Sequence, residues 1–239
     1  MDCYYVTGSS RGIGRALVER LLEDAGNAVV GLARGEGPQH PRYRHHRIDL
    51  SDLAQVKAFD FAPHPDARRI VLVNNAGVIA IAPVGKLPPA AIVQGYTVNL
   101  VAPALLSNRF VAAYREAGAE KIIVNIASGA GRNPTDGASI MGASKAGLDM
   151  LSRTIAAEQK FDGRGGFRVV AVSPGVVDTD MATVIINSSP EDSSRVATFR
   201  SMRQEGKLAS PREVAVGLCR MLERLPSTEE VLVTVQDFA

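Results

Sequence analysis

The chain lacks the features that mark disulfide-bonded, zinc-binding and membrane proteins. It contains two cysteines, Cys3 and Cys219, and no C-x-x-C pair, so neither a disulfide framework nor a zinc site is indicated. No apolar run reaches the roughly 18 residues that a membrane-spanning helix needs. The first apolar run begins almost at Met1, which leaves no room for a signal peptide. We therefore expect a protein of the reducing cytoplasm with no membrane partner.

The chain also lacks an excess of one charge. Its 27 lysines and arginines and 25 acidic residues give a formal net charge of +2, with the basic residues spread among the acidic ones. This balance does not indicate a nucleic-acid partner. The histidine-rich residues 39–47 match no metal-ligand spacing and include no carboxylate or cysteine, so no metal site is expected. A length of 239 residues, 46% of them hydrophobic, suits one domain spanning the chain.

A glycine-rich turn near the start is the feature around which the rest is organised. The sequence TGSSRGIG at residues 7–14 lies between an apolar run and a helical pattern. Gly8, Gly12 and Gly14 permit a tight turn, close approach of backbone to a pyrophosphate, and close packing of helix on sheet. The helix N-terminus adds amides and a positive dipole. Similar turns occur without a ligand, but the position after the first strand predicts a dinucleotide site.

Apolar runs and helical patterns alternate along the rest of the chain. Further strands are expected at residues 28–33, 47–50, 69–74, 121–127, 167–173 and 231–235, and long helices at 98–117, 139–159 and 210–224. This order predicts one doubly wound α/β Rossmann domain, with a seven-stranded parallel sheet and helices on both faces. Residues 178–209 are polar and have no strong apolar period, which predicts a flexible substrate lid.

Two arginines bear on the choice of cofactor. Arg34 follows the second strand, and no carboxylate occurs there before Glu36. Together with Arg11 in the glycine turn, it favours NADP(H) over NAD, because a basic residue accommodates a 2′-phosphate. Both arginines could instead be solvated surface charges. Asp49, at the end of the third strand, either accepts a hydrogen bond from an adenine amino group or is a turn residue.

Taken together and in order, the motifs resemble the short-chain dehydrogenase/reductase family along essentially the whole chain. The matching pieces are the glycine turn, Asp49-Leu50, Asn74-Asn75-Ala76-Gly77, Asn99, Ser128, Ser144-Lys145 and Pro174-Gly175. Arg34 and the ending VTVQD at residues 233–237 look more like the sepiapterin reductase and benzil reductase branch. The resemblance implies cofactor contacts at Gly8, Ser10, Arg11, Gly12, Ile13, Gly14, Arg34, Asp49, Leu50, Asn75, Ala76, Gly77, Lys145, Pro174, Gly175, Val177 and Thr179.

The same resemblance assigns catalytic roles and exposes one departure. It implies that Ser128 orients the substrate carbonyl, that Lys145 holds the nicotinamide ribose, and that Asn99 supports a proton-relay water. In the family a tyrosine stands four residues before the lysine, on the same helix face. Here that step from Lys145 and the thirteen-residue step from Ser128 both arrive at Met141. A thioether has no proton to give.

Three functions fit this sequence. The first is an NADP(H)-dependent reductase of ketones or 1,2-diketones that is impaired or uses a surrogate acid, such as a water on Lys145 or Asn99, or the Ser139 hydroxyl. Tyr96 is the one tyrosine to examine for this role. The second is a catalytically silent NADP(H)-binding regulatory or interaction protein. The third is an ordinary reductase in which Met141 has been substituted for tyrosine. The resemblance further implies a small-molecule carbonyl or alcohol substrate and a homodimer or homotetramer.

Overall fold

The computed structural model describes residues 1–162, 166–225 and 229–238, and within them seven parallel strands form one sheet. The strands are β1 (Asp2–Thr7), β2 (Asn27–Ala33), β3 (Tyr43–Arg47), β4 (Arg69–Asn74), β5 (Glu120–Ile126), β6 (Arg168–Ser173) and β7 (Leu232–Thr234). Their order across the sheet is β3-β2-β1-β4-β5-β6-β7. The order reverses between β1 and β4, and ligands of such sheets bind at the carboxyl ends of the strands at this point.

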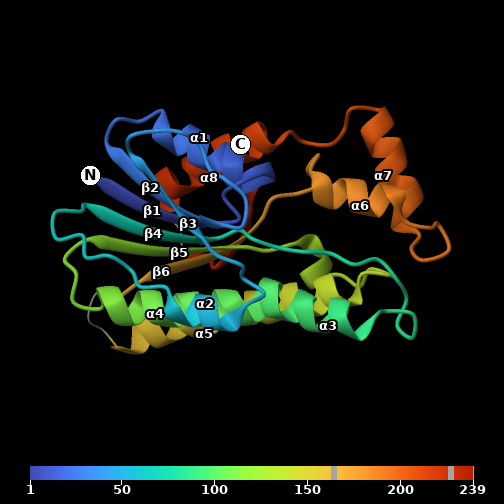
Figure 1. Ribbon diagram of the computed structural model, residues 1–239, viewed down its shortest axis with the longest axis horizontal. Helices are drawn as coiled ribbons and strands as arrows, with labels where there is room; N and C mark the ends of the chain where they lie inside the picture. Colours follow the sequence, from blue (N-terminus) through green and yellow to red (C-terminus); the bar gives the residue numbers. More distant parts are fainter. Residues whose placement is uncertain (163–165, 226–228, 239) are drawn as a thin grey trace.

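Helices cover both faces of the sheet, which confirms the doubly wound Rossmann-like fold. The helices are α1 (Gly12–Leu22), α2 (Leu53–Ala58), α3 (Pro89–Tyr96), α4 (Ala102–Tyr114), α5 (Ser139–Asp162), α6 (Asp180–Asn187), α7 (Arg195–Gln204) and α8 (Pro211–Arg224), with short turns of other helical types at η1 (Thr97–Val101), η2 (Gly129–Gly131) and η4 (Val235–Phe238). Figure 1 shows α1 and α8 on one face and α2, α4 and α5 on the other. Helices α6 and α7 stand beyond the sheet on the side of α8.

Alternation along the buried strands divides the core into two layers. On β1, Val6 packs into the layer formed with α1 and α8, whereas its neighbour Tyr5 packs into the layer formed with α4 and α5. Both are at most 1% exposed, because a central parallel strand is covered on both faces. The apolar runs that predicted these strands therefore follow directly from their position in the middle of the sheet.

One helical segment is long and apolar enough to span a membrane by length and composition alone. It runs from Pro89 to Tyr114 through α3, η1 and α4, although the expectation from sequence was that no run would be so long. Ala102, Leu106 and Phe110 on this segment are at most 1% exposed and pack in the α4 and α5 layer of the core. One face of α4, the second half of this segment, thus packs in the core.

Three elements differ from the sequence-based expectations. The third strand is β3, which precedes the expected residues 47–50; it is an edge strand whose last four residues are exposed, so it lacks an apolar signature. The first long helix begins at Pro89 rather than at residue 98, because α3 runs on through η1. Residues 178–209, the predicted lid, contain two regular helices instead of a flexible stretch. Helices α6 and α7 are too short, at eight and ten residues, to display a clear apolar period.

The lid is closed at its base by backbone pairing. Val177 and Ala209 form a parallel bridge, in which the Asp178 amide donates to the Ala209 carbonyl at 2.9 Å. Arg203, near the end of α7, donates hydrogen bonds to Asp178 and Thr183. Next comes α8, which begins at a capping box: Ser210 Oγ accepts from the Glu213 amide at 3.2 Å, and the Glu213 carboxylate accepts from the Ser210 amide at 2.7 Å.

Candidate active site

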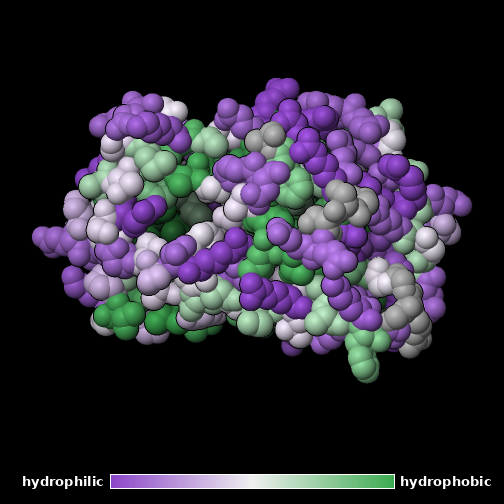
Figure 2. Space-filling model, turned by 180° about the vertical axis from the view of Figure 1, so that it is seen from behind, coloured by the Kyte–Doolittle hydropathy of each residue, from purple (hydrophilic) through white to green (hydrophobic). Residues whose placement is uncertain are grey.

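A cavity of about 1070 Å³ lies at the carboxyl ends of the central strands, where the strand order reverses. It is lined by the glycine turn, by residues that follow β2, β4, β5 and β6, by α5, and by the lid. In Figure 2 a hollow with hydrophobic walls opens on the left of the molecule, beneath a polar outer surface. One continuous space therefore joins the predicted cofactor residues to the predicted catalytic residues.

The glycine turn has the geometry that an anion-binding turn requires. Gly8 and Gly12 have φ of +67° and +55°, which other residues adopt only with strain. A Cβ on Gly14 would lie closer than 3 Å to the Gly8 carbonyl oxygen, so α1 can approach the turn only because residue 14 is glycine. Arg11, the N-cap of α1, makes no side-chain capping bond. The first amides of α1 are thus free to bind an anionic group.

Nearly all the predicted cofactor residues line the cavity. They are Gly8, Ser10, Arg11, Gly12, Ile13, Arg34, Asp49, Leu50, Asn75, Ala76, Gly77, Lys145, Pro174, Gly175, Val177 and Thr179. Gly14 does not line it but lies behind the turn, as its packing requires. The Asn75 side chain donates to the Thr7 carbonyl at 2.9 Å and so holds the end of β1 against β4. The individual contacts with a cofactor stay a prediction.

Two of the arginines at the cavity are paired with carboxylates. Arg11 Nη1 lies 2.8 Å from Asp180 Oδ2, which connects the glycine turn to α6. Arg34 Nη1 lies 3.8 Å from Asp49 Oδ2. Asp49 Oδ1 accepts from the backbone amide of Ser51 at 2.9 Å and from its hydroxyl at 2.7 Å, and these bonds lower the Asp49 pKa. In this structure Asp49 is therefore a turn residue and also the partner of Arg34.

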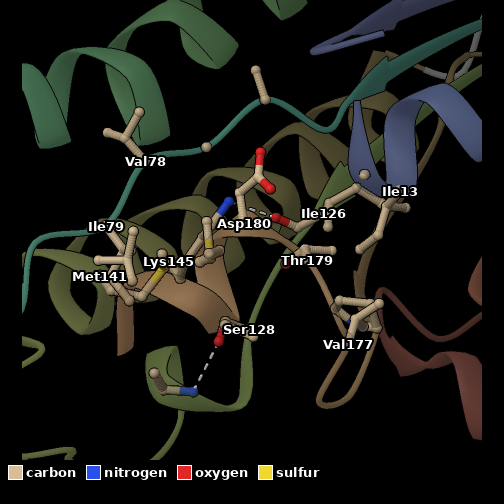
Figure 3. A pocket seen from close by; sticks show the side chains of 18 of the residues that line it. Ile13, Val78, Ile79, Ile126, Ser128, Met141, Lys145, Val177, Thr179 and Asp180 are labelled. Atoms are coloured by element: carbon tan, nitrogen blue, oxygen red, sulfur yellow. Dashed lines mark hydrogen bonds between the residues drawn. The ribbon is translucent and has the colours of Figure 1, made fainter. Parts of the chain in front are cut away.

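Lys145 lies on α5, with its ammonium group buried in the cavity wall. The side chain is 4% exposed, and Nζ donates to the Ile126 carbonyl at 2.6 Å. Burial lowers the pKa of Lys145 to about 8, and the nearby Asp149 carboxylate opposes this shift. Met141 lies one turn earlier and is 5% exposed. Figure 3 shows Met141 and Lys145 in the same part of the cavity, with Met141 beside Ile79. The residue four positions before the lysine thus lines the cavity and has no acidic proton.

Ser128 and Asn99 are placed differently. Ser128 follows β5 and lines the cavity, and its Oγ accepts from the Ala130 amide at 3.2 Å, so the hydroxyl proton is still available to a ligand (Figure 3). Asn99 is fully buried in η1 and lies behind the lining. Its amide exchanges two hydrogen bonds with Val78, at 2.8 and 2.9 Å, and donates to Ser144 Oγ at 3.3 Å. The π-helical turn that carries Asn99 therefore connects the loop after β4 to α5.

Neither side chain considered as a surrogate acid belongs to the cavity lining. Within the described ranges, Tyr96 and Ser139 are both absent from it. The cavity instead contains lid residues that sequence reasoning missed, among them Arg195, whose guanidinium lies 5.7 Å from the ring centroid of Phe199. No local motif marks these residues, because α7 reaches the cavity only through the folding of the lid.

Comparison with models of known protein families shows to which family this chain belongs. The model of the short chain dehydrogenase family matches residues 2–189. The chain belongs to the short-chain dehydrogenase/reductase family. Members bind a nicotinamide cofactor, so the chain is an oxidoreductase by family, in agreement with the resemblance seen in its motifs.

Individual members of the short-chain dehydrogenase/reductase family are similar over most of their length. A benzil reductase ((S)-benzoin forming) from Bacillus subtilis is 37% identical over 231 residues, covering 94% of each chain. A sepiapterin reductase from Meriones unguiculatus is 31% identical, covering 92% of this chain and 90% of its own. A crystal structure of a short-chain dehydrogenase/reductase from Saccharomyces cerevisiae has a TM-score of 0.84 at 23% identity and covers the whole of this chain.

Proposed function

We propose that this short-chain dehydrogenase/reductase is an NADP(H)-dependent carbonyl reductase that acts on ketones or 1,2-diketones without the usual tyrosine acid. The observation that carries the proposal is that one cavity joins the glycine turn to Ser128 and Lys145. The 37% identity to a benzil reductase supports a carbonyl substrate. The apolar residues of the lining, which include Met141, Ile79 and Met181, suit an uncharged ketone, either aromatic or aliphatic.

The preference for NADP(H) rests on the charges at the adenosine end of the cavity. Arg34 stands directly after β2, where an NAD-specific site would offer a carboxylate to the ribose hydroxyls. Its only close partner among the described residues is Asp49 at 3.8 Å, a distance too long for a hydrogen bond. A 2′-phosphate would therefore meet a guanidinium with unused donors.

The side chains divide the reaction among themselves as follows. When bound, the nicotinamide supplies the hydride. Ser128 donates a hydrogen bond to the substrate carbonyl oxygen and stabilises the negative charge that develops there. Lys145 keeps its charge over the neutral range, because its pKa of about 8 lies above pH 7. In the absence of a phenol, a water hydrogen-bonded to Lys145 gives a proton to the alkoxide oxygen, and the hydroxide that remains takes a proton from the solvent. Replacement of a well-placed acid in this way costs about 10²- to 10⁴-fold in rate.

A second function, favoured by Met141, is a silent NADP(H)-binding protein. The described part of the cavity lining contains no tyrosine, so no phenol from elsewhere in the fold replaces the missing one. Cofactor binding without turnover would then serve regulation or interaction with a partner.

We also propose a homodimer or homotetramer. Apolar side chains on the α3–η1 segment and on α5 are 37% to 67% exposed, namely Ile92, Val93, Val101 and Met150. Light scattering on the purified protein tests the assembly.

The decisive experiment follows NADPH oxidation with benzil and aromatic ketones by the natural protein and by Met141→Tyr, side by side. Turnover by both, with Met141→Tyr about 10²- to 10⁴-fold faster, is the expected result. Activity of Met141→Tyr alone would identify a reductase scaffold that lacks its acid. Tight NADPH binding with no turnover by either form would favour the silent protein. Absence of NADPH and NADH binding would refute both functions.

A further inference from the structure

Asp149 is a buried carboxylate that no step proposed above uses. It lies on α5 one turn after Lys145 and two turns after Met141, on the same side of the helix, and it is 5% exposed. Its Oδ2 accepts a hydrogen bond from Arg132 Nε at 3.0 Å, and its Oδ1 is buried and has no hydrogen-bond partner within the described ranges. Because a buried charge with an unsatisfied oxygen is costly, its presence in the fold calls for a function.

The partner of Asp149 belongs to the loop that carries Ser128. Ser128 caps the short turn η2, and Arg132 closes that turn at its other end. Between them Gly131 lies directly on α5: a Cβ there would lie 2.8 Å from the carbonyl carbon of Lys145 and 2.8 Å from the Ala146 amide. The ion pair of Arg132 with Asp149 therefore fastens the loop of Ser128 onto the turn of α5 that presents Lys145.

Among the described residues, Asp149 is the carboxylate whose charge raises the pKa of Lys145 against the effect of burial. In the part of the chain that the structure describes, Lys145 Nζ has one hydrogen-bond acceptor, the neutral carbonyl of Ile126. Three carboxylates line the cavity, and each has partners of its own: Asp49 accepts hydrogen bonds from Ser51, Asp136 accepts them from Ser194, and Asp180 pairs with Arg11. Met141 contributes no charge one turn before the lysine. The charged form of Lys145 thus depends on the carboxylate one turn after it.

We propose that Asp149 is a positioning residue of the active site, which holds the Ser128 loop against α5 through Arg132 and serves as the countercharge that keeps Lys145 protonated. The inference deepens the proposed function, because it concerns the same Ser128 and Lys145. It predicts in which direction the pKa of Lys145 shifts when either partner is removed. Loss of the carboxylate lowers the pKa of Lys145, whereas loss of the Arg132 guanidinium raises it, since the carboxylate is then no longer partly neutralised.

The test measures the pKa of Lys145 directly, by NMR titration of protein labelled with ¹³C at lysine Cε, with the signal assigned from Lys145→Met. Asp149→Asn is expected to lower the pKa by about one unit and Arg132→Gln to raise it. Asp162→Asn removes a carboxylate from the far end of α5 and is the matched control, with no change expected. An unchanged pKa in both variants, or shifts of the same sign, would overturn the proposal. Arg132→Gln alone decides the sign if Asp149→Asn does not fold.

This readout does not require turnover, so it separates the inference from the proposed reductase activity. Where NADPH oxidation is measurable, its alkaline limb is expected to move to lower pH in Asp149→Asn and to higher pH in Arg132→Gln. Arg132→Lys, which keeps the charge, is expected to restore the limb of the natural protein. A limb that stays in place while the NMR pKa moves would overturn the role of Asp149 in catalysis.

Discussion

Replacing Lys145 by methionine tests how much the buried ammonium group of the active site lowers the free energy of unfolding. The side chain is 4% exposed, so the charge is not screened by solvent, and lowering of the pKa from 10.5 to about 8 corresponds to about 3 kcal/mol. The substitution removes this burial cost, but it also removes the hydrogen bond to the Ile126 carbonyl, which lowers the free energy of unfolding by about 1 kcal/mol. Lys145→Met, which has nearly the same length without the charge, is therefore expected to be about 2 kcal/mol more stable than the natural protein at pH 7.

The pH dependence of this difference follows from linkage. Between pH 8 and 10.5 the unfolded chain binds one proton more than the folded chain at this lysine, so the natural protein gains stability as the pH rises. The burial cost is fully present below pH 8. It decreases by about 2 kcal/mol between pH 7 and pH 9.5, so the two proteins should become nearly equal in stability.

Urea unfolding of both proteins at several pH values between 7 and 9.5 measures this difference, provided that the two slopes with denaturant agree. A constant difference across that range would refute the assignment of a strongly depressed pKa to Lys145. A natural protein more stable than Lys145→Met at pH 7 would show that the ammonium group has polar partners beyond the Ile126 carbonyl. The same variant is expected to lose NADPH oxidation.

Two further predictions concern the cofactor site. Arg34→Ala is expected to weaken NADPH binding by about 10- to 100-fold, the value of a charged hydrogen bond, and to leave NADH binding nearly unchanged; an equal loss for both cofactors in a fluorescence titration would contradict the role of Arg34 at a 2′-phosphate. Gly14→Ala places a Cβ against the Gly8 carbonyl and is expected to cost about 1–3 kcal/mol and to weaken NADPH binding. Gly118→Ala, where nothing lies within 4 Å, is the control, and equal thermal shifts in the two variants would count against the packing argument.

The candidate site was predictable to the extent that its residues belong to local motifs. The glycine turn could be predicted from sequence because its backbone has positive φ at residues 8 and 12, and glycine is the residue that adopts positive φ without strain. Ser128 and Lys145 followed from spacing along the chain. Arg195 and Phe199 carried no such signal, because they reach the cavity from α7, more than sixty positions after the Ser128 turn. Asp149 also had no signal, since its partner Arg132 is visible only once the loop is folded onto α5.

By itself the sequence determined the α/β class, the parallel sheet, the family and the place of the glycine turn. These properties depend on runs of apolar residues and on short-range steric requirements, which are written along the chain. Tertiary structure alone decided that β3 lies at residues Tyr43–Arg47 on the sheet edge, that the lid is helical, and that Arg11 pairs with Asp180. Such features arise from contacts between segments that are far apart in the sequence, and the stability of these contacts cannot be predicted from a local sequence pattern.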